Sequence, residues 1–104
     1  MNRTQMLLTI LAEECSEIAH RASKAIRFGM DEVQPDQPDK GNNAARMMDE
    51  FNDLFAVIEV LYEEDLIPHI LDRKQIIAKK EKVKHFMQYS KERGMLTEKE
   101  ETNG

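Results

Sequence analysis

MMDEFNDLFAVIEVL, residues 47–61, is the most apolar segment of the chain and determines its fold class. Its apolar residues recur three and four positions apart, which is the spacing of one face of an α-helix. From Phe51 onward they surround most of the helix, and such a helix is buried on several sides. A chain of 104 residues has little else to cover it. We therefore expect a second copy to do so, in a homodimer or homotetramer.

The N-terminal part of the chain predicts another long helix, which begins at Thr4 as its N-cap and ends near Phe28. Gly29 follows as a helix stop. The apolar residues of this segment also repeat at helical spacing and form a stripe. Its members are Leu7, Leu8, Leu11, Cys15, Ile18, Ala22 and Ile26.

The remaining segments complete an all-α fold. Residues 30–43 contain two prolines and a glycine, so they predict a loop, of a length that is usually functional or mobile. The central helix is capped by Asn42 or Asn43 and continues to about Glu64. A third helix, with a weaker apolar stripe, is predicted over residues 71–91. These elements fit a helical bundle.

Composition and charge narrow the functional class. We expect one domain over residues 1–92 and a polar tail over residues 93–104. The net charge of −5 argues against binding nucleic-acid polymers, which need a basic surface. No apolar run approaches the roughly 20 residues of a membrane span, and acids come too early for a secretory signal. A single cysteine, Cys15, fits a small core position and a reducing, cytoplasmic setting.

Two pairs of carboxylates interrupt the two most apolar helices. Glu14 and Glu17 are three residues apart, and so are Glu50 and Asp53. Residues at this spacing are neighbours on a helix surface, and isolated ionised carboxylates are costly to bury. Two such pairs on facing helices predict a cation site of oxygen ligands, which suits Mg²⁺, with Mn²⁺ as the alternative ion. The competing interpretation is a non-catalytic dimerisation or adaptor module whose acids form salt bridges with Lys and Arg.

The acids also form two short motifs. Residues 13–17, EECSE, match an EExxE pattern, and residues 50–53, EFND, match ExxD. Over about residues 5–65 the chain resembles the MazG-like all-α nucleoside triphosphate pyrophosphohydrolases. This resemblance implies an oligomeric helical bundle that hydrolyses an NTP or dNTP to the monophosphate and pyrophosphate with Mg²⁺. The alternative within the same fold is a hydrolase of another phosphorylated compound, such as phosphoribosyl-ATP.

The resemblance assigns roles to individual residues of this chain. It implies metal ligation by Glu14, Glu17, Glu50 and Asp53, and catalysis by these four together with Glu13, as a further ligand or water-positioning base. The phosphate oxygens also need donors, for which the sequence offers Lys24, Arg27 and Lys80. Phe51 and Phe55 are candidates for an apolar pocket around the base, with core packing as the competing role.

Overall fold

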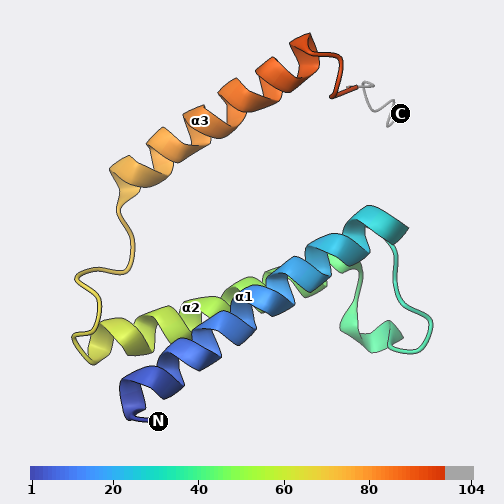
Figure 1. Cartoon of the computed structure of the whole chain (residues 1–104). Helices are drawn as coiled ribbons and strands as arrows, with labels where there is room; N and C mark the ends of the chain where they lie inside the picture. The colour runs from blue at the N-terminus through green and yellow to red at the C-terminus, as the bar shows by residue number, and fades with distance from the viewer. Residues whose placement is uncertain (98–104) are drawn as a thin grey trace. The chain divides into compact units, whose positions relative to one another are not determined.

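The computed structural model describes residues 1–97, and all its regular structure is helical (Figure 1). The predicted all-α fold is thereby confirmed for the described residues, and the helix boundaries lie close to the predicted ones. Residues 98–104, most of the predicted polar tail, lie outside the described residues. The elements in chain order are α1 (Arg3–Phe28), the short 3-10 helix η1 (Pro38–Lys40), α2 (Asn43–Glu63) and α3 (Arg73–Glu92).

The chain divides into two compact units. One covers residues 1–70 and contains α1, η1 and α2, and the other begins at Leu71 and contains α3. Among the described helices, none combines the length and the apolar character that crossing a membrane requires.

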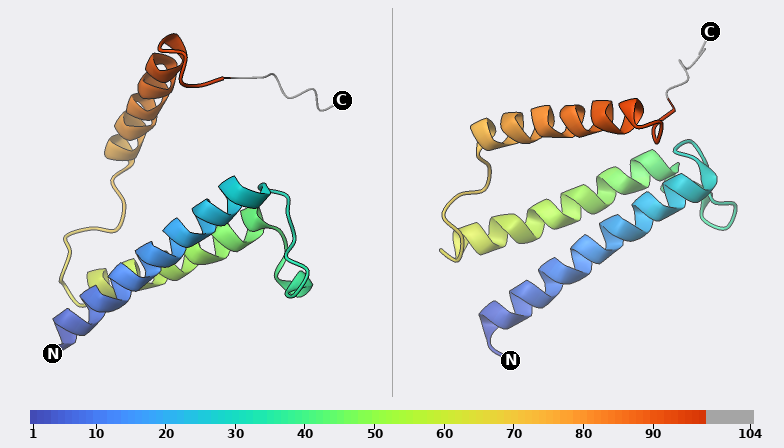
Figure 2. Two further views of the ribbon diagram at one scale, coloured as in Figure 1. Left: turned by 45° about the vertical axis from the view of Figure 1, so that its right-hand side comes forward. Right: turned by 45° about the horizontal axis from the view of Figure 1, so that its top comes forward.

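In the first unit, α1 and α2 pack side by side in opposite directions (Figures 1 and 2). Leu61 of α2 is 3% exposed and is the one fully buried apolar residue within residues 1–97. At the end of the pair, Nε and Nη2 of Arg3 donate to the two carboxylate oxygens of Glu64, at 2.6 and 2.7 Å. This bidentate ion pair joins the start of α1 to the residue that follows α2.

The N-terminus of α1 is capped by Asn2, so the predicted cap at Thr4 is wrong. The Asn2 side chain accepts from the backbone N–H of Gln5 at 2.8 Å, and the Gln5 side chain accepts from the N–H of Asn2 at 2.9 Å. Glutamine three residues after the cap completes this capping box, whereas Thr4 is followed at that spacing by Leu7, which has no acceptor. At the other end, Gly29 stops the helix as predicted, with φ of 99°.

The buried face of α1 is narrower than the predicted apolar stripe. It follows Leu11, Glu14, Ile18 and Ala22, which are all partly buried. Residues one position further along the chain turn about 100° away from this face. Consequently three predicted members are exposed: Leu8, Cys15 and Ile26. The prediction that Cys15 is a core residue is wrong for the same reason.

On α2, only one side is covered by α1. Leu61 and Val57 lie on the covered side, whereas Phe51 and Phe55 are 39% and 38% exposed. The expected burial of α2 on several sides therefore does not occur within one chain. The competing role of Phe51 and Phe55, packing in the core, is therefore not fulfilled within the single chain.

The segment between α1 and α2 is tied to the start of α2 by Asn43, which is fully buried. Its side-chain amide donates to the carbonyl of Gly29 at 2.7 Å and to Oε1 of Glu32 at 3.0 Å. Its backbone N–H donates to the carbonyl of Glu32 at 3.0 Å. Arg46, one turn into α2, donates to the side chains of Gln34 and Gln37. These bonds hold the part of the loop between Gly29 and Gln37 against the start of α2.

Candidate metal centre

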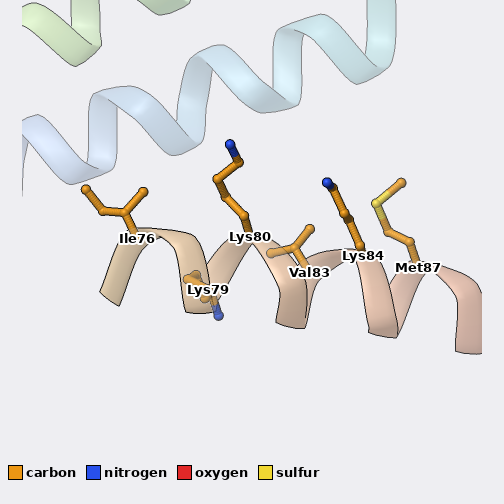
Figure 3. A pocket seen from close by; sticks show the side chains of 6 residues that line it. All are labelled: Ile76, Lys79, Lys80, Val83, Lys84 and Met87. Atoms are coloured by element: carbon orange, nitrogen blue, oxygen red, sulfur yellow. The ribbon is translucent and has the colours of Figure 1, made fainter. Parts of the chain in front are cut away.

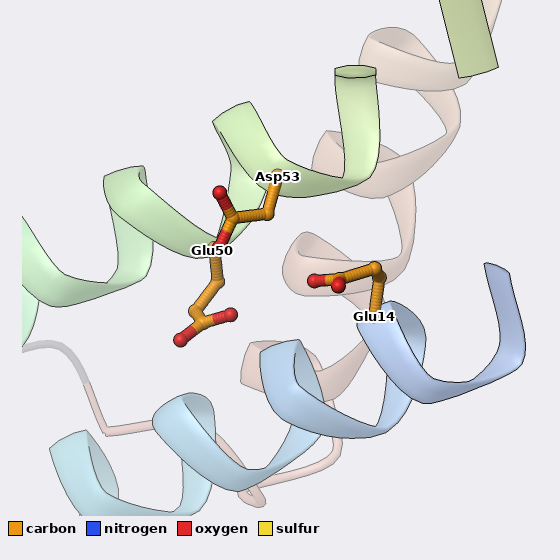
Figure 4. Close-up of side chains that lie close together, drawn as sticks. All are labelled: Glu14, Glu50 and Asp53. Carbon is orange, nitrogen blue, oxygen red and sulfur yellow. The ribbon is translucent and has the colours of Figure 1, made fainter. Parts of the chain in front are cut away.

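Three carboxylates from α1 and α2 converge on one small volume. Glu14 comes from the middle of the buried face of α1, and Glu50 and Asp53 lie one turn apart on α2 (Figure 4). Each contributes an oxygen, and these oxygens all lie within 4.8 Å of one another. Glu14 and Glu50 are partly buried, whereas Asp53 is exposed. The cluster therefore lies at the edge of the helix interface and is open to solvent.

This arrangement fits a small divalent cation. Mg²⁺ binds oxygens at about 2.0–2.1 Å, so two ligands on opposite sides of the ion are about 4.2 Å apart. Adjacent ligands of an octahedral ion are closer, at about 3.0 Å, so side-chain rotations that draw the three oxygens together would place them around one ion. Three carboxylates also leave coordination positions of an octahedral ion for water or phosphate oxygens, as is usual for Mg²⁺.

The charges of the cluster act on Glu14 in particular. Desolvation at the helix interface raises the pKa of its carboxyl above the ordinary value, and the neighbouring carboxylates of Asp53 and Glu50 raise it further. Glu17 and Glu13 on the same helix add to the same effect. Ionisation of Glu14 therefore costs more free energy in the folded chain than in the unfolded chain, and a cation bound at the cluster would offset that cost.

The raised pKa of Glu14 predicts an unusual pH dependence of stability in the presence of a chelator. Its folded-state pKa is above the unfolded value, so the folded chain binds the proton more tightly, and stability falls as pH rises. Glu14→Gln is therefore expected to melt at a higher temperature than the wild type at about pH 7, with a gap that narrows as pH falls toward the ordinary glutamate pKa of 4.5. Thermal denaturation followed by circular dichroism at several pH values measures this gap.

The comparison with Glu14→Gln isolates this effect from the opposite contribution of Glu64. The hydrogen bond from Arg3 holds the pKa of Glu64 below its ordinary value, so that contribution is lost as pH falls. Because both proteins contain the Arg3–Glu64 pair, its contribution cancels in the difference. A gap that is absent at neutral pH, or that widens on acidification, would contradict the predicted effect of Glu14.

The other predicted acids lie outside the three-carboxylate cluster. Glu17 and Glu13 are exposed on α1. Glu17 influences the pKa of Glu14, which is consistent with a position near the cluster. Its role as a fourth ligand, and that of Glu13 as a ligand or base, stay predictions.

The predicted phosphate donors have different surroundings. Lys24 and Arg27 both lie over the ring of Phe28, with Lys24 Nζ at 5.7 Å and Arg27 Cζ at 4.9 Å from its centroid. Lys80 is exposed on α3, in the second unit. None of these observations tests phosphate binding, so the roles of all three cations stay predictions.

Phe51 and Phe55 point away from the carboxylates of their own chain. Phe55 follows Asp53 by two residues, which is a rotation of about 160° around the helix. Phe51 is about 100° from Glu50 by the same geometry. One α2 helix therefore does not direct both these rings and the carboxylates into a common pocket.

Sequence reasoning missed Arg21. It is 8% exposed, and its Nη1 is one of two buried side-chain polar atoms without a hydrogen-bond partner among residues 1–97, the other being Oδ1 of Asn43. Arg21 lies seven residues after Glu14, which places it two turns further along the same face of α1. This seven-residue spacing is the feature of the sequence that indicates a position of Arg21 on the face of Glu14. A buried guanidinium N–H without an acceptor is costly, so the position favours an anionic oxygen.

Comparisons of this chain with protein-family models, curated proteins and solved structures gave no match.

Proposed function

We propose that this protein is a Mg²⁺-dependent nucleoside triphosphate pyrophosphohydrolase of the MazG-like type, which converts an NTP or dNTP to the monophosphate and pyrophosphate. The observation that carries the proposal is the convergence of Glu14, Glu50 and Asp53 between α1 and α2. These residues come from the EExxE and ExxD motifs, which are separated by more than thirty positions in the sequence.

The chemistry of the donor set favours a phosphorylated substrate. Mg²⁺ is usually held by one or two carboxylates plus waters and substrate phosphates. When bound, such an ion neutralises phosphate charge, polarises the phosphoryl group and lowers the pKa of a bound water. Glu14 and Glu50 would hold it from the partly buried side of the cluster. The exposed side, at Asp53, leaves room for the triphosphate.

The positive charge of Arg21 also favours a phosphorylated substrate. It is the buried cation on the face of α1 that carries Glu14, and one of its N–H groups lacks an acceptor. In the proposed complex it donates to a non-bridging phosphate oxygen, in a charge-assisted hydrogen bond. Lys24 and Arg27, further along α1, are the additional candidates for this role.

The proposal is tested with a panel of ribo- and deoxynucleoside triphosphates, canonical and modified, with and without Mg²⁺. Pyrophosphate and orthophosphate are measured separately. We expect monophosphate and pyrophosphate to form only with Mg²⁺. Phosphoribosyl-ATP belongs in the same panel, because it tests the alternative substrate class of this fold.

Thermal denaturation provides a second measurement that does not depend on turnover. An ion that binds only the folded chain stabilises it by about 2.7 kcal/mol at one hundred times its dissociation constant. We therefore expect Mg²⁺ to raise the melting temperature of the wild type and to have little effect on Glu14→Gln. Absence of both turnover and a Mg²⁺ effect would contradict the proposal in favour of a non-catalytic helical module.

A further inference from the structure

The buried guanidinium of Arg21 has no counter-ion in its own unit. Arg21 is 8% exposed, and among residues 1–97 its side chain has neither a hydrogen bond nor an ion pair. The lysines of α3, among them Lys80 and Lys84 (Figure 3), belong to the other unit and do not enter this inference. A buried charge without a partner is costly, so Arg21 requires an anion that residues 1–70 do not supply.

The packing of α1 on α2 shows which part of α2 lies level with Arg21. Glu14 converges with Glu50 and Asp53, and the two helices run in opposite directions (Figure 2). A step forward along α1 therefore corresponds to a step back along α2. Arg21, seven residues after Glu14, is level with residues 43–46, the first turn of α2. The ion pair at the other end of the two helices gives the same register.

The first turn of α2 adds positive potential to the layer of Arg21. The N-terminal end of a helix carries a partial positive charge, which stabilises anions nearby. The first N–H groups of α2 already donate to loop carbonyls and to the capping side chain of Asn42. They are therefore not free donors, and the guanidinium of Arg21 is the group in this layer that lacks an acceptor.

The competing partner for Arg21 is Oδ1 of Asn43, which lies in the same layer. It is the other buried side-chain atom without a hydrogen-bond partner among residues 1–97. A water between the two atoms would satisfy both hydrogen bonds. It would not balance the charge of the guanidinium, because the amide oxygen is neutral. An anionic oxygen provides both the acceptor and the opposite charge.

The spacing between the two layers restricts the length of the anion. Seven residues correspond to a rise of about 10 Å along α1, from the layer of the three carboxylates to the layer of Arg21. A single phosphate group is too short to reach both layers. A chain of linked phosphates is long enough, and the substrate of the proposed function carries such a chain.

We propose that Arg21 binds the terminal phosphate group of a triphosphate whose other phosphates lie at the three-carboxylate cluster, and that it thereby selects triphosphates over diphosphates. This inference rests on the proposed function and adds the direction of the phosphate chain. The chain runs from the carboxylates toward the first turn of α2. A diphosphate bound at the same carboxylates is too short to pair with Arg21 and leaves its charge uncompensated.

Binding of two inorganic anions tests the inference without turnover. Pyrophosphate and tripolyphosphate are titrated into the chain in excess Mg²⁺, and isothermal titration calorimetry gives the two dissociation constants. We expect the wild type to bind tripolyphosphate at least about tenfold more tightly, because hydrogen bonds between charged groups are strong. Arg21→Met keeps an apolar stem and removes the charge and the donors, so it should lose most of this preference.

Arg3→Met is the matched control. It makes the same chemical change on the same helix, about 27 Å from Arg21 along the axis, where Arg3 pairs with Glu64. The preference for tripolyphosphate should persist in this variant. An equal loss in both variants would overturn the inference, because net charge would then set the affinity. Circular dichroism checks folding, and Arg21→Gln takes the place of Arg21→Met if the latter does not fold.

A purely structural Arg21 predicts a different result. If Arg21 only bonds Asn43, Arg21→Met lowers the melting temperature without anions and keeps the preference, which would overturn the inference. We expect that melting temperature to equal or exceed the wild-type value, because an unpaired buried charge is removed.

The outcome is separable from that of the proposed function. A wild type that hydrolyses nucleoside triphosphates but binds the two anions alike, or neither, would overturn the role of Arg21 and leave the enzymatic proposal standing. A preference that depends on Arg21 without any nucleotide turnover would support the role of Arg21 and contradict the proposed activity.

Discussion

Glu50→Gln and Asp53→Asn are each expected to reduce Mg²⁺-dependent pyrophosphate release by more than about a hundredfold. Loss of groups that only orient metal ligands already costs about 10–100-fold in metal affinity or activity, and these two residues would contact the ion itself. Each substitution keeps the side-chain volume and removes one negative charge from the cluster. The folded chain should therefore persist, with a melting temperature in chelator at or above that of the wild type.

Asp49→Asn is the matched control. Asp49 lies one turn before Asp53 on α2, is exposed, and does not belong to the cluster of Glu14, Glu50 and Asp53. Asp49→Asn makes the same chemical change and the same change in net charge as Asp53→Asn. Because Asp49 lies outside the cluster, turnover close to that of the wild type is expected. Loss of activity in Asp49→Asn equal to that in Asp53→Asn would mean that overall charge on α2, and not the three-carboxylate geometry, supports catalysis.

Asn43→Ala is expected to destabilise the chain by about 2 kcal/mol or more, because it leaves two acceptors without their donor. These acceptors are the carbonyl of Gly29 and Oε1 of Glu32, and the lost side chain is fully buried. A loss of this size corresponds to a fall in melting temperature of roughly 10 °C for a domain of about 100 residues. Urea denaturation followed by circular dichroism gives the free energy of unfolding.

Asn52→Ala provides the comparison for Asn43→Ala. Asn52 is the same residue type on the same helix, but its side chain is exposed. Alanine has the higher helix propensity, so Asn52→Ala should be neutral or slightly stabilising. If the two variants unfold at the same urea concentration, the amide of Asn43 does not contribute to the closure of the loop.

The sequence alone predicted the three helices and the approach of three of the four paired acids, Glu14, Glu50 and Asp53. Helical spacing located α1, α2 and α3, and the position of Glu14 within an apolar stripe indicated that it lies between helices. The convergence of Glu14 with Glu50 and Asp53 followed from packing two amphipathic helices together. These features depend on local periodicity, which a sequence displays directly.

Other features depend on details that periodicity does not contain. The predicted stripe on α1 is wider than the buried face, because Cys15 and Ile26 are apolar residues that fall about 100° beyond that face. The sequence analysis misses Arg21 because arginine is seldom buried: its spacing from Glu14 places it on the same face, and only packing reveals that it is buried there. Of the two predicted caps of α2, Asn42 caps the helix, whereas the amide of Asn43 anchors the preceding loop.

Closure of the loop by Asn43 also bears on how such a chain can diverge in evolution. Because the bonds of Asn43 and Arg46 hold the loop between Gly29 and Gln37, the span around η1 that follows can change in length while α1 and α2 keep their alignment. Lengthening a closed flexible loop is thermodynamically mild, at about 0.6 kcal/mol for each doubling. Insertions and deletions should therefore accumulate around Pro38–Lys40, and the same span offers a place to graft a peptide tag without moving the carboxylates.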